Sequence, residues 1–174
     1  MTSTPFLTEP VGALRHTQVQ TAFGEFTIVA DDAAVTAVYF PGNEPDDSWG
    51  EPTTPDDHPV LARAASELRE FLAGERTEFD VPLRPVGTDF QRQAWSALIQ
   101  IPYGQTRSYA QQAAVIGRPS AVRAVGAANG RNPIPVIIPC HRVIGSGGTL
   151  TGYAGGTELK ARLLELESGQ ASLM

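Results

Sequence analysis

Hydrophobic and polar residues alternate in short stretches between Val19 and Phe40, with breaks at Gly24 and at Asp31-Asp32. A period of two residues is typical of strands with one buried face. Because turn-forming residues separate the stretches, the pattern predicts two or three antiparallel strands in this part of the chain.

The spacing of apolar residues changes after position 59. Over Val60–Leu72 they recur three and four positions apart and stop before Gly74, which predicts a helix. The intervening segment 41–59 is rich in Pro, Asp, Glu and Gly, so we expect a surface loop whose Trp49 caps the core. A short apolar run at Phe79–Leu83 predicts one further strand, and residues 84–87 are expected to form a linker.

The second half of the chain has the spacing and the boundary residues of four helices. Ser108 and Gln111 form the S-x-x-Q pattern of a capping box, and Gly117 ends the helix that they begin. Pro119 suits the first turn of the next helix. These two short helices, joined by a turn that contains glycine, predict a helix-turn-helix. The four helices are expected at residues 89–100, 108–116, 120 to about 128, and 158–167.

Charge is distributed unevenly along the 174 residues, although the composition (41% hydrophobic, 18% charged) is that of an ordinary globular protein. The net charge is −6, yet residues 84–142 carry seven arginines and a single acidic residue, Asp89. Residues 1–83, in contrast, carry 4 basic and 15 acidic residues. Such asymmetry is expected of a phosphate-facing surface, and seven solvated arginines scattered around the fold would give the same count.

Other features exclude several classes of protein. No stretch approaches the roughly 20 apolar residues that span a bilayer, and residues 1–10 lack the pattern of a secretory signal. The single cysteine, Cys140, cannot form an internal disulfide, and no Cys and His residues are spaced to bind zinc. We therefore expect a cytoplasmic protein without a metal, a cofactor or a membrane partner.

The segment around Cys140 reads Ile-Pro-Cys-His-Arg-Val-Ile over residues 138–144. A thiol attacks as its thiolate, and an ordinary cysteine, with a pKa of about 8.5, is only slightly ionised at neutral pH. Attack therefore needs a neighbouring base or positive charge, and His141 and Arg142 offer one of each. The alternative is a buried structural cysteine, which is common for an isolated residue of this type.

From Asp89 to the last predicted helix, the sequence resembles the methylated-DNA–protein-cysteine methyltransferases, the O6-alkylguanine-DNA alkyltransferase family. Several motifs in a fixed order carry this resemblance, whereas the first 86 residues match only loosely. The motifs are the segment 138–144, Thr-Gly-Tyr-Ala-Gly-Gly at 151–156, Ile-Pro-Tyr-Gly at 101–104 with residues 106–109, Arg-Ala-Val-Gly at 123–126, and Asn132-Pro133.

Pattern and resemblance together predict an α/β (α+β) protein of two domains. Residues 1–86 are expected to form a small N-terminal antiparallel β-sheet domain with a helix. Residues 87–174 are expected to form a mainly helical, winged-helix-like domain that contains the helix-turn-helix.

The resemblance implies a set of catalytic residues. Cys140 is similar to the family's alkyl acceptor, and His141 to the base that takes the thiol proton through a water. Glu167 is similar to the carboxylate that orients this histidine, and Asn132 to the asparagine that supports the turn beneath the site. From the residues alone, Glu167 would be a solvated charge near a helix end, and Asn132 a turn former.

The resemblance also implies contacts with DNA and with the damaged base. The O6 atom of guanine lies inside the duplex, so a protein nucleophile reaches it only after the nucleotide is extruded. Arg123 is similar to the arginine that fills the vacated place in the stack, and Tyr109 to the tyrosine that pushes on the target phosphate. Ala124 and Gly126 let their helix approach the backbone closely, and Arg142 is counted with these DNA-contacting residues.

The expected base pocket consists of Tyr153, Ala154 and Gly155. Many relatives have serine after the tyrosine, whereas this chain has Ala154, so a side-chain hydroxyl contact to O6 is not expected.

The predicted function is direct reversal of DNA damage. We expect irreversible transfer of the alkyl group from O6-alkylguanine, and to a lesser extent O4-alkylthymine, in double-stranded DNA to Cys140, after flipping through the minor groove. The protein is expected to be a single-turnover enzyme and a monomer that could assemble cooperatively on DNA. Alternatives are a helix-turn-helix regulator, a lesion-sensing protein that does not repair, and a cysteine hydrolase.

Overall fold

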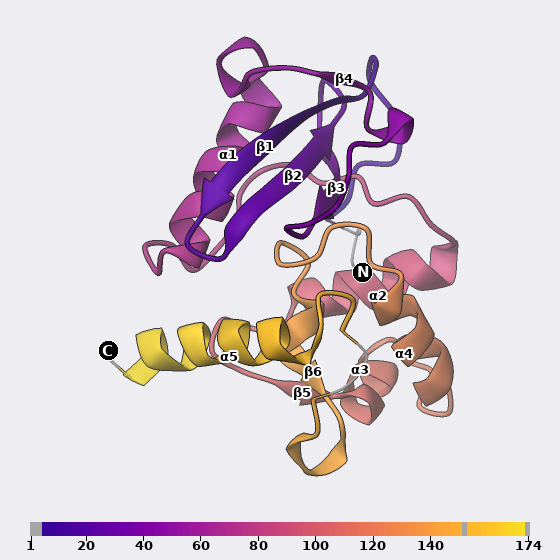
Figure 1. Cartoon of the computed structure of the whole chain (residues 1–174). Coiled ribbons are helices and arrows are strands. Elements are labelled where there is room, and N and C mark those ends of the chain that lie inside the picture. Colours follow the sequence, from indigo (N-terminus) through magenta and orange to yellow (C-terminus); the bar gives the residue numbers. More distant parts are fainter. Residues whose placement is uncertain (1–4, 151–152, 173–174) are drawn as a thin grey trace. The chain divides into compact units, whose positions relative to one another are not determined.

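The computed structural model describes residues 5–150 and 153–172, so the expected Thr151-Gly152 part of the pocket motif lies outside the described residues. The described residues form two compact units, which divide between Val86 and Gly87 (Figure 1).

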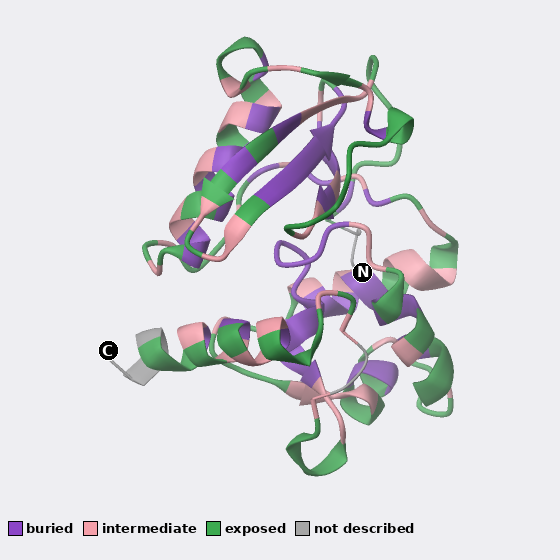
Figure 2. Ribbon diagram, in the orientation of Figure 1, coloured by how far each residue is buried: buried purple, intermediate pink, exposed green. Residues whose placement is uncertain are grey.

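The first unit is built on a four-stranded sheet. Strands β1 (Arg15–Thr21), β2 (Gly24–Ala30) and β3 (Val35–Tyr39) pair antiparallel, which confirms the expectation of antiparallel strands. A two-residue strand, β4 (Glu51–Pro52), adds to the outer side of β1 in parallel, which gives the order β3-β2-β1-β4. Figure 2 shows that β2, at the centre, is buried along most of its length.

Helix α1 (Pro59–Leu72) covers one face of this sheet, as its spacing predicted (Figure 1). His58 caps its first turn, because Nδ1 of His58 accepts a hydrogen bond from the backbone N–H of Leu61 at 3.1 Å. The side chains that α1 buries recur three and four residues apart and form the core with the sheet: Leu61, Ala64, Ala65, Leu68, Phe71 and Leu72.

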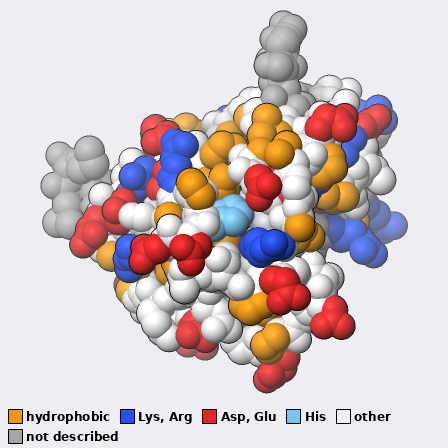
Figure 3. Space-filling view, turned by 90° about the horizontal axis from the view of Figure 1, so that it is seen from above, with side chains coloured by type: hydrophobic (Ala, Val, Ile, Leu, Met, Phe, Trp, Pro, Cys, Tyr) orange, Lys and Arg blue, Asp and Glu red, His pale blue; other side chains and the backbone are white. Residues whose placement is uncertain are grey.

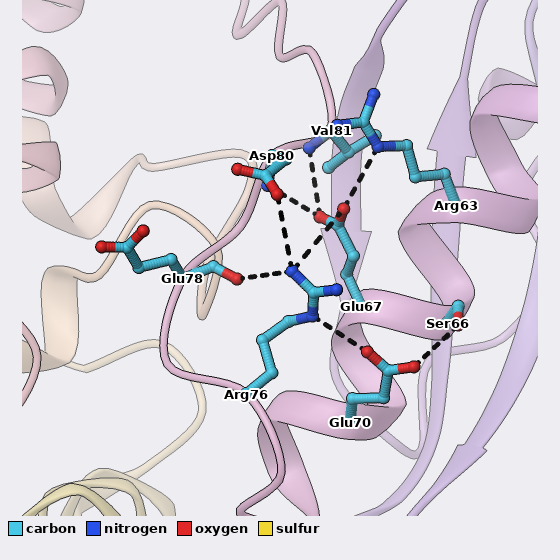
Figure 4. A network of polar contacts seen from close by, with 8 residues as sticks. All are labelled: Arg63, Ser66, Glu67, Glu70, Arg76, Glu78, Asp80 and Val81. Carbon is cyan, nitrogen blue, oxygen red and sulfur yellow. Dashed lines mark hydrogen bonds and ion pairs between the residues drawn. The ribbon is translucent and has the colours of Figure 1, made fainter.

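The strand expected at Phe79–Leu83 is absent, and the prediction was wrong because a side chain distant in sequence takes two of its backbone donors. Glu67, on α1, is buried, and its Oε1 accepts hydrogen bonds from the backbone N–H groups of Asp80 and Val81 at 2.9 and 3.1 Å (Figure 4). A carboxylate thus satisfies donors that a neighbouring strand would otherwise bind. Only Leu83 makes strand-like bridges in this stretch, to Phe6 and to Val35.

The expected loop at 41–59 contains two short 3-10 helices, η1 (Asp47–Trp49) and η2 (Pro55–Asp57), besides β4. Trp49 is buried, as expected, and packs against the rings of Tyr39 and His16.

On the face shown in Figure 3, acidic side chains are interspersed with basic and apolar ones and do not gather in one patch.

The second unit is mainly helical. Its helices are α2 (Asp89–Ile99), α3 (Tyr109–Val115), α4 (Val122–Gly130) and α5 (Thr157–Ser172). The capping box of Ser108 and Gln111 is confirmed, and Thr88 with Gln91 forms another at the start of α2. Helix α4 begins two residues later than expected, because a hydrogen-bonded turn from Arg118 to Ala121 precedes it. Helices α3 and α4 pack on each other and on α2, as a helix-turn-helix does.

A two-stranded parallel pair completes this unit. Strand β5 (Arg107–Ser108) leads into α3, and β6 (Val143–Ile144) follows Cys140–Arg142. The pairing therefore fixes the start of α3 beside the segment that contains the cysteine. None of the helices in the described ranges is long and apolar enough to cross a membrane.

One buried ion pair holds the end of the first unit in place. Asp31 is fully buried and accepts hydrogen bonds from the backbone N–H groups of Val11, Ala33 and Ala34 and from Nε of Arg84, the last at 2.9 Å. Burial by itself raises the pKa of Asp31, but these hydrogen bonds outweigh it and the pKa is lowered.

We predict that Asp31→Asn lowers the free energy of unfolding by about 2 kcal/mol at neutral pH, because an amide cannot accept all four bonds. A carboxylate whose pKa is lowered by folding stabilises the native state above its unfolded pKa of about 3.9, and this stability is lost as the pH falls through the folded pKa. The difference in free energy of unfolding between the wild type and the variant, measured by urea unfolding, should therefore shrink below about pH 4. Asp32→Asn, at a neighbouring and exposed position, is the control. A deficit that stays constant with pH would contradict the assignment.

Candidate active site around Cys140

The backbone before Cys140 is a tight buried turn. Residues 134–140 are all buried, and Val136 has a φ of 72°, a left-handed conformation that is rare for a β-branched residue. Asn132 closes the turn, since its Nδ2 donates to the carbonyl of Ile138 and its Oδ1 accepts from the N–H of Ile134, both at 2.9 Å. The run at 136–138 is thus buried, and its shape depends on the side chain of Asn132.

Cys140 begins a 3-10 helix, η3 (Cys140–Arg142), and is 8% exposed. Burial raises the pKa of the Cys140 thiol to about 11, although a hydrogen bond from the Asn132 side chain and the charge of Lys160 act in the opposite direction. The group is therefore a thiol at neutral pH, and it needs a base that removes its proton before it can attack.

His141 and Glu167 are the candidates for such a base and its orienting acid. Both are almost fully buried, and Nε2 of His141 lies 2.7 Å from Oε2 of Glu167. Burial lowers the pKa of His141, and the carboxylate of Glu167 opposes this effect. A neutral imidazole that donates from Nε2 leaves its Nδ1 as a proton acceptor. Nδ1 has no hydrogen-bond partner among the described residues, so it is available for that role.

Arg142 belongs to this buried cluster, and the expectation that it contacts DNA is corrected. The residue is 7% exposed, and its Nε and Nη2 donate to the two oxygens of Glu167 at 2.9 and 3.0 Å. Its Nη1 donates to the carbonyl of Ile101 at 2.7 Å, and the guanidinium lies over the ring of Tyr103. A guanidinium engaged in this way has no free face for a phosphate.

The structure adds groups to the site that the sequence analysis did not single out. They are the carbonyl of Ile101, the N–H of Gly104, which lies 3.4 Å from Oε1 of Glu167, and Lys160. Lys160 is the only lysine of the chain, and it is buried on α5. Helical spacing could have found it, because Lys160, Leu163 and Glu167 are three and four residues apart and share one buried face.

Of the expected pocket residues, Tyr153 lies near His141, and the centroids of the two rings are 6.5 Å apart. Burial raises the pKa of Tyr153 well above its usual value, and the charges of Cys140 and Glu167 add to this effect. The phenol thus stays protonated and can donate a hydrogen bond. Ala154 is exposed and Gly155 is half-buried.

The other expected DNA-contacting residues lie on the helix-turn-helix. Arg123 and Ala124 are exposed on α4. Tyr109 is the first residue of α3, and a Cβ built on Gly126 would lie 3.9 Å from its ring, so the structure brings Tyr109 and α4 together. The missing side chain at Gly126 therefore reflects no crowding inside the protein, because a Cβ there would make an ordinary van der Waals contact with Tyr109.

One compact unit thus contains a buried thiol, a base oriented by a carboxylate, and an exposed helix-turn-helix with an arginine on its second helix. These features define a helix-turn-helix protein with a cysteine nucleophile.

Comparison with known proteins identifies the family. Residues 89–169 match the 6-O-methylguanine DNA methyltransferase DNA-binding domain, and residues 14–85 match the ribonuclease-like domain of the same proteins. The constitutive methylated-DNA–protein-cysteine methyltransferase of Bacillus subtilis is 47% identical over 156 residues, which cover 87% of this chain and 94% of that protein. The chain belongs to the methylated-DNA–protein-cysteine methyltransferase family.

Solved structures agree with this assignment and with the predicted fold class. The O6-methylguanine methyltransferase of Mycobacterium tuberculosis superposes with a TM-score of 0.81 at 43% identity, covering 91% of this chain and 94% of that one. A structure of the M. tuberculosis protein OGT in complex with DNA gives the same TM-score at 44% identity, with 90% and 94% covered.

We predict that Glu167→Gln lowers the free energy of unfolding by about 3 kcal/mol, because it leaves the guanidinium of Arg142 buried without a counter-charge. Chemical denaturation at neutral pH measures the effect. Glu165→Gln, on the exposed side of the same helix, is the matched control and should change stability by no more than about 0.5 kcal/mol. Equal losses in the two variants would show that the buried cluster contributes nothing beyond helix propensity.

Proposed function

We propose that this protein repairs alkylated DNA by transferring the alkyl group from O6-alkylguanine, and to a lesser extent O4-alkylthymine, to its own Cys140. The observation that supports this most is the position of Cys140, directly before a buried His141–Glu167 pair, in a unit that matches the family's DNA-binding domain. The relative solved in complex with DNA supports double-stranded DNA as the partner.

The proposed chemistry balances without a cofactor. The bond between the sulfur of Cys140 and the alkyl carbon forms while the bond from that carbon to O6 breaks, and the electron pair of the broken bond stays with the guanine. The thiol proton passes through a water to Nδ1 of His141, and the hydroxyl of Tyr153 gives its proton to N3 of the guanine, which leaves neutral. The proton held by the imidazolium of His141 then returns Tyr153 to its phenol form through solvent, so that the thiol proton is the one that the guanine gains overall. A thioether has no good leaving group, so each molecule acts once.

Access to O6 requires that the damaged nucleotide leaves the stack. We propose that α4 enters the minor groove, that Arg123 takes the place of the extruded base, and that Tyr109 presses on the target phosphate. The small residues Ala124 and Gly126 allow the helix to approach the backbone. Affinity then comes from phosphate contacts and shape, which suits damage that occurs regardless of sequence.

Three residues are proposed to receive the flipped base: Tyr153, Ala154 and Gly155. Since Ala154 has no hydroxyl, any hydrogen bond to O6 from this part of the pocket comes from the backbone. Asn132 is proposed to act indirectly, by holding the turn on which Cys140 sits.

Intact-protein mass spectrometry tests the function. Incubation with duplex DNA that carries O6-methylguanine should add one methyl group per molecule, and Cys140→Ala should gain none. Because the product is permanent, methyl transfer should stop when each protein molecule has reacted once.

Other outcomes would identify the rival functions. Repeated turnover without a lasting mass gain would indicate a cysteine hydrolase. Binding to the damaged duplex without any mass gain would indicate a lesion sensor or a regulator, and either result would rule out repair by self-alkylation.

The proposed extrusion of the base has its own test. Arg123→Ala should slow repair of O6-methylguanine in duplex DNA by at least about tenfold, since unstacking a base costs a few kcal/mol. Its reaction with free O6-benzylguanine, which needs no extrusion, should change little. Rates come from quenched reactions followed by mass spectrometry, with Arg131→Ala, an exposed arginine just beyond α4, as the control. Equal losses with both substrates would remove Arg123 from the extrusion step.

A further inference from the structure

A reciprocal pair of side-chain amides lies between the two helices of the helix-turn-helix. Gln112 on α3 is 1% exposed and Asn129 on α4 is 6% exposed. Nε2 of Gln112 donates to Oδ1 of Asn129 at 2.9 Å, and Nδ2 of Asn129 donates to Oε1 of Gln112 at 2.8 Å. The pair is therefore a closed double hydrogen bond between buried side chains, where such bonds are strong and costly to leave unmade.

The same amides tie the helix-turn-helix to the helix beneath it. Nε2 of Gln112 also donates to the carbonyl of Ala94 on α2 at 3.0 Å. A second bond joins α2 to α4, from Nε1 of Trp95 to the carbonyl of Ala128 at 2.8 Å. Directional hydrogen bonds thus join all three helices.

Helix α4 packs on α2 and α3 through few buried side chains, and the apolar ones are small. Its buried residues are Val125, Ala128 and Asn129, so the apolar area that it buries is small. Among the described residues, no side chain caps its N-terminus at Ala121. Apolar packing of small side chains tolerates sliding and rotation, whereas a buried double hydrogen bond does not. The amide pair therefore sets the register of α4 to a degree that packing cannot.

The pair also lies where α4 leads into the turn below the nucleophile. The carbonyl of Asn129 accepts a hydrogen bond from the N–H of Asn132 at 3.2 Å. The side chain of Asn132 in turn holds Ile134 and Ile138, two residues before Cys140. A continuous series of hydrogen bonds thus runs from the amide pair to the active-site turn.

We propose that Gln112 and Asn129 are positioning residues that keep α4, and with it Arg123, in register with the turn that carries Cys140. This role rests on the proposed function and deepens it. A base that Arg123 extrudes enters the pocket only if the pocket keeps a fixed distance and orientation relative to α4. The amide pair holds α4 in that position. Loss of the amide pair should therefore slow alkyl transfer from a base that is extruded from duplex DNA. It should leave alkyl transfer from a free base unchanged.

A double-mutant cycle on the full-length protein tests the proposal, with Gln112→Ala, Asn129→Ala and the combined variant. Each single variant should slow methyl transfer from O6-methylguanine in duplex DNA by about tenfold, the effect expected when a buried amide loses its partner. The combined variant should be no slower than the slower single one. Reaction with free O6-benzylguanine should stay within about twofold of wild type. Gln93→Ala, at an exposed glutamine of α2, is the control.

Stability is followed separately, so that unfolding is not mistaken for a loss of register. All rates are measured well below each variant's Tm, which is taken from circular dichroism. The exchanged pair, Gln112→Asn with Asn129→Gln, restores the donors and acceptors, and it should recover duplex repair relative to the combined alanine variant.

Three results would overturn the proposal. They are equal losses with both substrates, losses that multiply in the combined variant, and unchanged duplex repair in the single variants. Failure of the wild-type protein to take up a methyl group from either substrate is a distinct result, which would contradict the proposed function and this role together.

Discussion

The carboxylate of Glu167 is the interaction on which the candidate active site depends. Its two oxygens bind His141 and Arg142, so one residue of α5 holds two consecutive residues of η3. Burying ionisable groups is costly unless each is paired, and here the pairing is nearly complete. Because Arg142 also bonds the carbonyl of Ile101, the cluster fixes the segment before β5 as well. A shift in any of these elements would leave a buried charge unpaired.

This arrangement explains how the site can hold a reactive residue without exposing it. The burial that raises the pKa of Cys140 also lowers that of His141, so the pair rests as thiol and neutral imidazole. A resting thiol reacts slowly with stray electrophiles, and the base beside it is ready to take the proton. Reactivity then depends on which molecules can reach the sulfur of Cys140. In the proposed function, the residues around the pocket and on α4 control this access.

Much of this architecture follows from local sequence rules, and the failures have identifiable causes. Apolar spacing predicted α1 and α2, and the Ser108 capping box located α3, because these signals lie within a few residues. The strand expected at 79–83 failed because a distant side chain, Glu67, takes its backbone donors. Arg142 was misassigned because a count of arginines cannot separate a buried ion pair from a phosphate contact. The left-handed backbone conformation of Val136 could not be predicted from the sequence either, because a valine side chain disfavours it and the surrounding structure imposes it.

The second unit uses two kinds of buried polar contact, and their difference matters for a protein that meets a polyanion. The cluster of Glu167, His141 and Arg142 is ionic, so its energy depends on protonation and on the local field. The pair of Gln112 and Asn129 is neutral, and neither amide titrates. As phosphates approach α4, their field acts on every nearby charge but does little to a closed pair of amide dipoles. Ionic groups therefore suit the site of the proposed proton transfer, and neutral amides suit the helix that is proposed to contact DNA.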